Sequence, residues 1–102
     1  MRFDTSDLIR NLEKDIQLTE KQLLELTEKT TLDAQRDLML ATPVDEGTAR
    51  RGWQATLPTK AYEAGVIENA VPYLGALNDG HSRQAPANFV EGIVQRYNDG
   101  GA

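Results

Sequence analysis

Histidine and its neighbours are the first place in this sequence where chemistry could reside. His81 is the only histidine, with Asp79 two residues before it and Ser82 directly after it. A hydrolase needs such groups to face one another, but side chains one residue apart rarely do, and the G-x-S-x-G turn that exposes a nucleophilic serine is absent. A lone histidine beside a glycine is more often a loop residue than a catalyst. We therefore expect no catalytic residues, and a small enzyme or toxin using His81, Asp79 and Arg83 is the alternative.

Metal and phosphate sites have equally little support from the residue types. The chain has no cysteine, and it lacks the D-x-D-x-D-G spacing of a calcium loop. Carboxylates at Asp45, Glu68 and Asp79 could form an oxygen site only if the fold happened to bring them together. Residues 80–84 hold one glycine and one arginine, which is weak for a phosphate loop. We expect no cofactor and no bound metal.

Adjacent arginines at positions 50 and 51 are the feature most compatible with contact to nucleic acid. The net charge of the chain is −5, however, and the acidic residues are spread along it. Nucleic-acid binding usually requires a basic footprint. Arg50 and Arg51 are therefore expected to form a solvated pair or a salt bridge between subunits, and a nucleic-acid-binding module is the less favoured hypothesis.

The elements that must position these residues divide at Pro43. No glycine or proline lies between Arg2 and this residue, whereas all eight glycines and all four prolines lie at or after it. The first part is therefore predicted to be helical and the second part turn-rich and mixed. A chain of this length is expected to form a single domain over 1–102, with an N-terminal helical region at 1–42 and a sheet and C-terminal helix at 43–102.

The N-terminal region reads as one long helix. Capping residues at 4–6 predict its start, and the restriction that proline places on Thr42 predicts its end near Ala41. A continuous helix of about 36 residues would span ~54 Å, far more than a domain of this size needs. It must therefore either break, with the β-branched pair in residues 28–31 as the expected point, or protrude and need a second subunit.

Self-association through this helix is the resulting prediction. Leu12 and Ile16 lie on its apolar stripe and are candidate subunit-interface residues. Trp53 and Tyr73 are further candidates, because Trp and Tyr are enriched at interfaces, although Trp53 reads equally well as a core residue. Arg83 offers a planar fork to a carboxylate on an adjacent copy.

The second half contains two turns around a hairpin. Pro43, Asp45 and Gly47 are predicted to form the first turn, in which glycine supplies a left-handed conformation and aspartate caps a short helix. Alternating residues at 53–57 and 62–67 predict the hairpin. A short helix is expected at 72–77.

A second turn precedes the last helix. Gly80 and Pro86 are its structural residues, and the helix is predicted to start at 86–88. Together the elements predict an α+β fold with a long N-terminal helix, a small antiparallel sheet and a C-terminal helix. The N-terminus lacks the apolar run of a signal peptide, and no apolar stretch approaches the roughly 20 residues that span a bilayer. We therefore expect a soluble protein that begins in a cytoplasm and does not bind a membrane.

Four short motifs occur in order between residues 43 and 89. P-V-D-E-G at 43–47 resembles a P-V-D-T-G turn, and R-R-G-W at 50–53 resembles an R-x-x-W segment. N-A-V-P-Y at 69–73 resembles N-x-x-P-Y, and L-N-D-G-H-S-R-Q-A-P-A-N-F at 77–89 resembles L-x-x-G-x-S-x-Q-A-P-x-x-F. All four are similar to motifs of the tail-completion and head–tail joining proteins of long-tailed bacteriophages, the group that contains the minor tail protein Z of lambda-like phages. Each motif is weak alone, but four in order are fairly specific.

The resemblance implies a non-enzymatic structural protein of the virion. Copies would form a homo-oligomeric ring in the neck or at the head-proximal end of the tail, with a sixfold ring favoured, and would contact neighbouring neck and tail proteins. DNA would pass through as cargo, and assembly would take place in the host cytoplasm. A tail terminator ring is the alternative within the same class. Glu46 stands where the family usually has Thr, and Asn88 where Gly is common.

Overall fold

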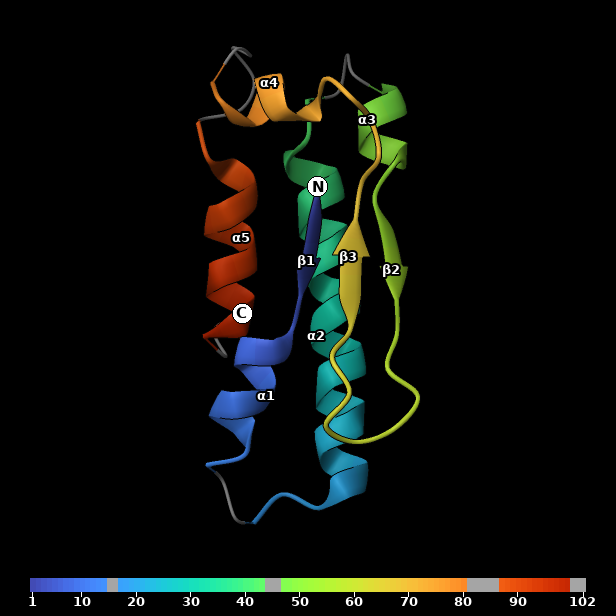
Figure 1. Cartoon of the computed structure of the whole chain (residues 1–102), viewed down its shortest axis with the longest axis vertical. Coiled ribbons are helices and arrows are strands. Elements are labelled where there is room, and N and C mark those ends of the chain that lie inside the picture. Colours follow the sequence, from blue (N-terminus) through green and yellow to red (C-terminus); the bar gives the residue numbers. More distant parts are fainter. Residues whose placement is uncertain (15–16, 44–46, 81–86, 100–102) are drawn as a thin grey trace.

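The computed structural model describes residues 1–14, 17–43, 47–80 and 87–99. Figure 1 shows one long helix, α2, along the main axis, with a small sheet on one side of it, α5 beside it, and α3 and α4 at the upper end. This arrangement of helices with a small antiparallel sheet confirms the α+β class. The elements in order are β1 (Arg2–Asp4), α1 (Ser6–Leu12), α2 (Glu20–Ala41), α3 (Gly47–Arg51), β2 (Gln54–Thr56), β3 (Val66–Glu68), α4 (Leu74–Asn78) and α5 (Phe89–Asn98).

The N-terminal helical region consists of two helices, so of the two alternatives the long helix breaks, although not at residues 28–31. A capping box starts α2, in which the Gln22 N–H donates to Thr19 Oγ1 (3.1 Å) and the Thr19 N–H donates to Gln22 Oε1 (3.0 Å). Leu8 and Ile9 of α1 are buried within the same chain, where α1 contacts α2 and α5. The motive for a protruding helix that needs a second subunit therefore disappears.

Helix α2 continues through residues 28–31, where a break was expected. The hydroxyls of Thr27 and Thr31 donate to the carbonyls of Leu23 (2.8 Å) and Thr27 (2.7 Å) one turn earlier. Both threonines are buried. Their hydroxyls are satisfied inside the helix, so the β-branched pair is compatible with it. The helix ends at Ala41 as predicted, and Thr42 before the proline is extended (φ −69°, ψ 133°).

The sheet has the strand order β1-β3-β2, and both pairings are antiparallel. The β2–β3 hairpin confirms the prediction, whereas three residues are too few for the sequence pattern to predict β1. Phe3, Ile67 and Ala55 form one row across the sheet. Ile67 is buried in this row, which faces the helices. The adjacent positions of all three strands lie on the opposite, outer face.

The core lies between α2, the sheet, α4 and α5. Its buried members are apolar residues of α2, α3, β3, α4 and α5, together with Trp53 between α3 and β2: Ala34, Leu38, Ala49, Trp53, Ile67, Leu74, Leu77, Phe89, Val90 and Tyr97. Within the described residues, no helix combines the length and the apolar character that crossing a membrane would require.

Candidate functional site

The motif residues of the resemblance gather at one end of the molecule. We call this the motif end and define it as the C-terminal turn of α2, helix α3, residues 69–73 and helix α4, which lie together at the top of Figure 1. Three clusters of hydrogen bonds hold it together, and each is built around a side chain from a different motif.

The first cluster closes the C-terminus of α2. Trp53 is 2% exposed, and its Nε1–H donates to Thr42 Oγ1 at 2.9 Å. Arg50 donates from Nε to the Thr42 carbonyl (3.1 Å) and from Nη2 to the Leu40 carbonyl (3.0 Å). A cation at the C-terminal end of a helix satisfies free carbonyls and complements the helix dipole. Arg50 is therefore a helix cap and not a solvated partner of Arg51.

The second cluster ties α3 to the turn after β3. Asn69 is 1% exposed, donates from Nδ2 to the Ala49 carbonyl (2.8 Å), and accepts from the Val71 N–H at Oδ1 (3.0 Å). A Cβ on Gly52 would lie 2.9 Å from Asn69 Oδ1, so this glycine permits a close approach. The R-R-G-W and N-A-V-P-Y motifs thus meet in space and need each other's residue types.

The third cluster joins α4 to α5. Asn78 accepts from the Val90 N–H at Oδ1 (3.0 Å) and donates from Nδ2 to both carboxylate oxygens of Glu91 (2.9 and 2.7 Å). Gly80 ends α4 with φ 90°, a conformation that favours glycine. Asn88 precedes α5 with φ 61°. Asparagine tolerates this left-handed region better than most residues, which explains how it can stand where the family commonly has glycine.

The first predicted turn is only partly described. Pro43 is buried, and Asp45 lies outside the described residues. Gly47 is the first residue of α3 and is not among the described residues with positive φ, so the expected left-handed conformation is wrong. A Cβ there would instead meet the end of the flexible Arg51 side chain at 3.0 Å. In the second turn Pro86 lies outside the described residues, as do His81 and Arg83.

The candidate interface residues fall in different environments. Trp53 lies in the core of its own chain, so it adds no surface to a neighbour. Tyr73 precedes α4 at the motif end and is 41% exposed. Leu12 ends α1 and is half-buried, and Ile16 lies outside the described residues. Of the three that the structure describes, Tyr73 alone is exposed.

A further polar cluster joins α2 to α5, and no local sequence signal predicts it. Tyr97 Oη and Arg96 Nη2 both donate to Asp37 Oδ2, the second at 2.8 Å. The hydrogen bond from Tyr97, assisted by Arg36 and Arg96, lowers the pKa of Asp37 below its ordinary value. Burial and the same hydrogen bond raise the pKa of Tyr97. This cluster fixes two helices that lie 60 residues apart in the chain.

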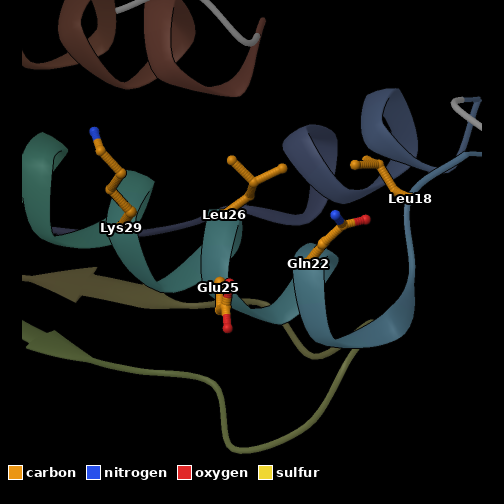
Figure 2. Close-up of a pocket in the computed structure, with 5 residues that line it drawn as sticks. All are labelled: Leu18, Gln22, Glu25, Leu26 and Lys29. Carbon is orange, nitrogen blue, oxygen red and sulfur yellow. The ribbon is translucent and has the colours of Figure 1, made fainter.

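Hollows on the described part of the surface include two of similar volume. One of about 360 Å³ lies at the start of α2, and Figure 2 shows Leu18 and Leu26 on the same side with Gln22 between them and Glu25 pointing away. The other, of about 350 Å³, lies between β1, α1 and α5. It is lined by Phe3, Asp7, Glu91, Val94, Gln95, Asn98 and Asp99.

The described residues offer little for catalysis or metal binding. Across residues 1–14, 17–43, 47–80 and 87–99, no three His, Cys, Asp or Glu side chains group in a way that could hold a metal ion. Asp79 is exposed beyond α4, and Glu68 lies on the outer face of the sheet. The polar side chains that the fold does gather bond to backbone groups and to one another. Comparison of the chain with protein-family models, with curated proteins and with solved structures finds no match.

Proposed function

We propose that this chain is a structural virion protein of a long-tailed bacteriophage. It forms a ring in the neck or at the head-proximal end of the tail, completes the tail and joins it to the head. The proposal begins from the four ordered motifs between residues 43 and 89, which resemble those of the tail-completion family.

One observation carries the proposal furthest, namely that these motifs meet in space and supply what the backbone needs. Arg50, Trp53 and Asn69 occupy fixed motif positions and bond to groups of other segments. Gly80, a fixed position of the fourth motif, supplies a backbone conformation with positive φ after α4. A chance match of short motifs has no reason to pick out residues that determine the fold. The motifs therefore act as a fold signature, which favours a shared architecture and a structural role.

Exposed apolar side chains support a role in assembly. Leu40 is 63% exposed beside the motif end and Tyr73 is 41% exposed within it. Tyr is enriched at protein interfaces because its ring is large and rigid and carries a polar tip. We propose that the motif end contacts a neighbouring phage protein through these residues. A tail terminator is the second candidate within this class, and a map of neighbours in the assembled particle separates the two.

Interrupting the reading frame in a phage genome that carries it tests the proposal. We expect DNA-filled heads and separate tails in electron micrographs, with joined particles restored when the intact chain is supplied from a plasmid. A plasmid copy carrying Tyr73→Asp serves as a second arm and should restore joining poorly while the purified variant remains folded. Joined, infectious particles in the absence of the chain would refute the proposed role.

A further inference from the structure

The two edges of the small sheet expose complementary backbone groups. Met1 and Asn69 exchange both backbone hydrogen bonds at 2.8 Å, and the Thr5 N–H donates to the Gly65 carbonyl at 3.0 Å. Bonded and non-bonded pairs alternate in an antiparallel ladder. The backbone groups of Arg2 and Asp4 therefore point away from β3. By the same alternation, the N–H and C=O of Ala55 point away from β3 on the far edge.

At each edge strand a side chain of the same chain bonds one outward backbone carbonyl, and the next outward backbone groups are free in the part of the chain that the structure describes. Gln35 Nε2 donates to the Trp53 carbonyl (3.0 Å) beside β2, and Asn98 Nδ2 donates to the Asp4 carbonyl (3.1 Å) beside β1. The outward backbone groups of Ala55 and Arg2 make no hydrogen bond within the described chain. Residues 53–57 carry no charge. Free edges are commonly protected by charged residues or proline, so β2 is the less protected edge, whereas β1 carries the charged Arg2 and Asp4.

We propose that copies of this chain join by sheet extension, with β2 of one copy lying parallel to β1 of the next. This inference rests on the ring proposed above and names its subunit contact. Both β1 and β2 run antiparallel to β3, so they are parallel to each other within one chain. A rotation about an axis along the strands preserves their direction and brings β2 beside the neighbour's β1.

The exposed groups fit this pairing and define its register. In a parallel ladder one residue bonds to the two residues that flank its opposite number. The Ala55 N–H would donate to the Arg2 carbonyl of the next copy, and the Ala55 carbonyl would accept from that copy's Asp4 N–H. Ala55 then stands opposite Phe3, which continues the row of Phe3, Ile67 and Ala55 from copy to copy.

The side chains on both faces of the sheet also match. Ala55 shares its inward face with Leu57, which is 37% exposed, and the hollow of about 350 Å³ beside β1 is lined in part by Phe3 and Val94. Leu57 would enter this hollow. On the outer face the uncharged Gln54 would lie beside Arg2 of the next copy, so no like charges meet there.

The contact joins two different edges and is therefore heterologous. A heterologous contact repeats from copy to copy and closes into a ring when the rotation between copies permits it. The arrangement leaves no open strand edge in the closed ring, since every β2 covers a β1.

Cysteine cross-linking of the full chain tests the register directly, because the chain contains no cysteine. Arg2 and Gln54 both pair with Glu68, on opposite sides of it. They are thus two strand spacings apart, roughly 9.6 Å, which is beyond the reach of a disulfide within one copy. Oxidation of the Arg2→Cys/Gln54→Cys variant should give a ladder of cross-linked species that ends at the copy number of the ring. Each single variant, and the control Arg2→Cys/Lys21→Cys, should give no ladder.

Sedimentation of the same samples separates failure of the contact from failure of the ring. Assembly without a ladder would overturn the sheet-extension contact and leave the ring standing, whereas a monomer without a ladder at every concentration would overturn both. Leu57→Asp should also raise the concentration for half-assembly at least about tenfold, because it removes an apolar side chain from the contact. Leu26→Asp, in the hollow at the start of α2 that includes no residue of β1 or β2, should leave that concentration unchanged. Equal assembly of wild type and Leu57→Asp would contradict the contact.

Discussion

The motif end and the opposite end of this molecule are stabilised in different ways. At the motif end, buried polar side chains such as Asn69 and Asn78 bond to backbone groups of distant segments. At the opposite end, Thr5 and Asn98 also bond to backbone groups of distant segments. Where α2 packs on Gly65, however, the buried hydroxyls of Thr27 and Thr31 bond within their own helix. That end depends on close approach, as Gly65 shows where it packs on Thr31.

This difference means that the two ends should respond to different kinds of substitution. Loss of a hydrogen-bonding group at the motif end leaves buried backbone groups without partners, which is costly. Where α2 packs on Gly65, loss of a threonine hydroxyl affects one turn of one helix, but an added methyl group has no room. Substitutions of both kinds therefore test whether the two ends are stabilised differently.

Replacement of Trp53 should have the largest effect. Trp53→Ala removes a buried indole and its hydrogen bond to Thr42, and we expect a loss of about 3–5 kcal/mol in the free energy of unfolding. Trp53→Phe keeps most of the volume and should cost roughly 1–2 kcal/mol. Urea denaturation of both variants measures these values. A Trp53→Ala variant as stable as Trp53→Phe would show that the cluster does not hold the motif end.

A methyl group on Gly65 should destabilise the opposite end. Its Cβ would lie 2.1 Å from Thr31 Oγ1, so helix and sheet must separate, at an expected cost of about 1–3 kcal/mol. Thr31→Ala in the same chain should recover part of this loss, which a double-mutant cycle measures. Gly92→Ala is the matched control, since nothing lies within 4 Å of its Cβ and it should stabilise α5 by about 0.5–1 kcal/mol. Additive effects of the Gly65 and Thr31 substitutions would contradict the packing argument.

Replacing two asparagines compares a buried hydrogen-bonding side chain at the motif end with an exposed one at the opposite end. Asn69→Ala leaves the Ala49 carbonyl and the Val71 N–H without partners and should cost about 1–3 kcal/mol. Asn11 also bonds a backbone carbonyl, that of Asn98 at 2.9 Å, but it is exposed on α1. Asn11→Ala should therefore cost less than about 1 kcal/mol. Equal losses in thermal or urea unfolding would remove the distinction between the two ends.

The cluster around Asp37 should give the smallest effect at neutral pH and become visible in acid. Its pKa is lowered in the folded chain, so its contribution is present above the unfolded pKa and is lost as the pH falls through the folded value. Tyr97→Phe removes the largest cause of the shift, and the melting temperature of that variant should fall less steeply on acidification than that of wild type. Parallel melting curves for the two proteins between neutral and acid pH would count against the assignment.

Much of the fold could be predicted from local signals. Pro43 ends α2 by restricting Thr42, and the alternation near Trp53 predicts the hairpin. The capping box at Thr19 is also a local signal, but it lies inside an apolar repeat that is typical of a continuous helix. The sequence therefore predicts the break at residues 28–31, whereas α2 begins at Glu20. β1 is too short to show any alternation.

The polar clusters could not be predicted in the same way. The hydrogen bond between Tyr97 and Asp37 joins residues 60 positions apart, and neither residue lies in a recognisable motif. Gly47 follows a turn pattern but begins a helix. Glycine after proline and aspartate is compatible with both, so the sequence alone does not distinguish them. Gly65 has no local reason to be glycine, and its role becomes clear only once Thr31 lies against it.

Cryo-electron microscopy of the intact phage particle tests the central claim most directly. The account predicts density for this chain between head and tail, in a closed sixfold ring, with the motif end against a neighbouring phage protein. Purified, infectious particles that lack the chain altogether would contradict it.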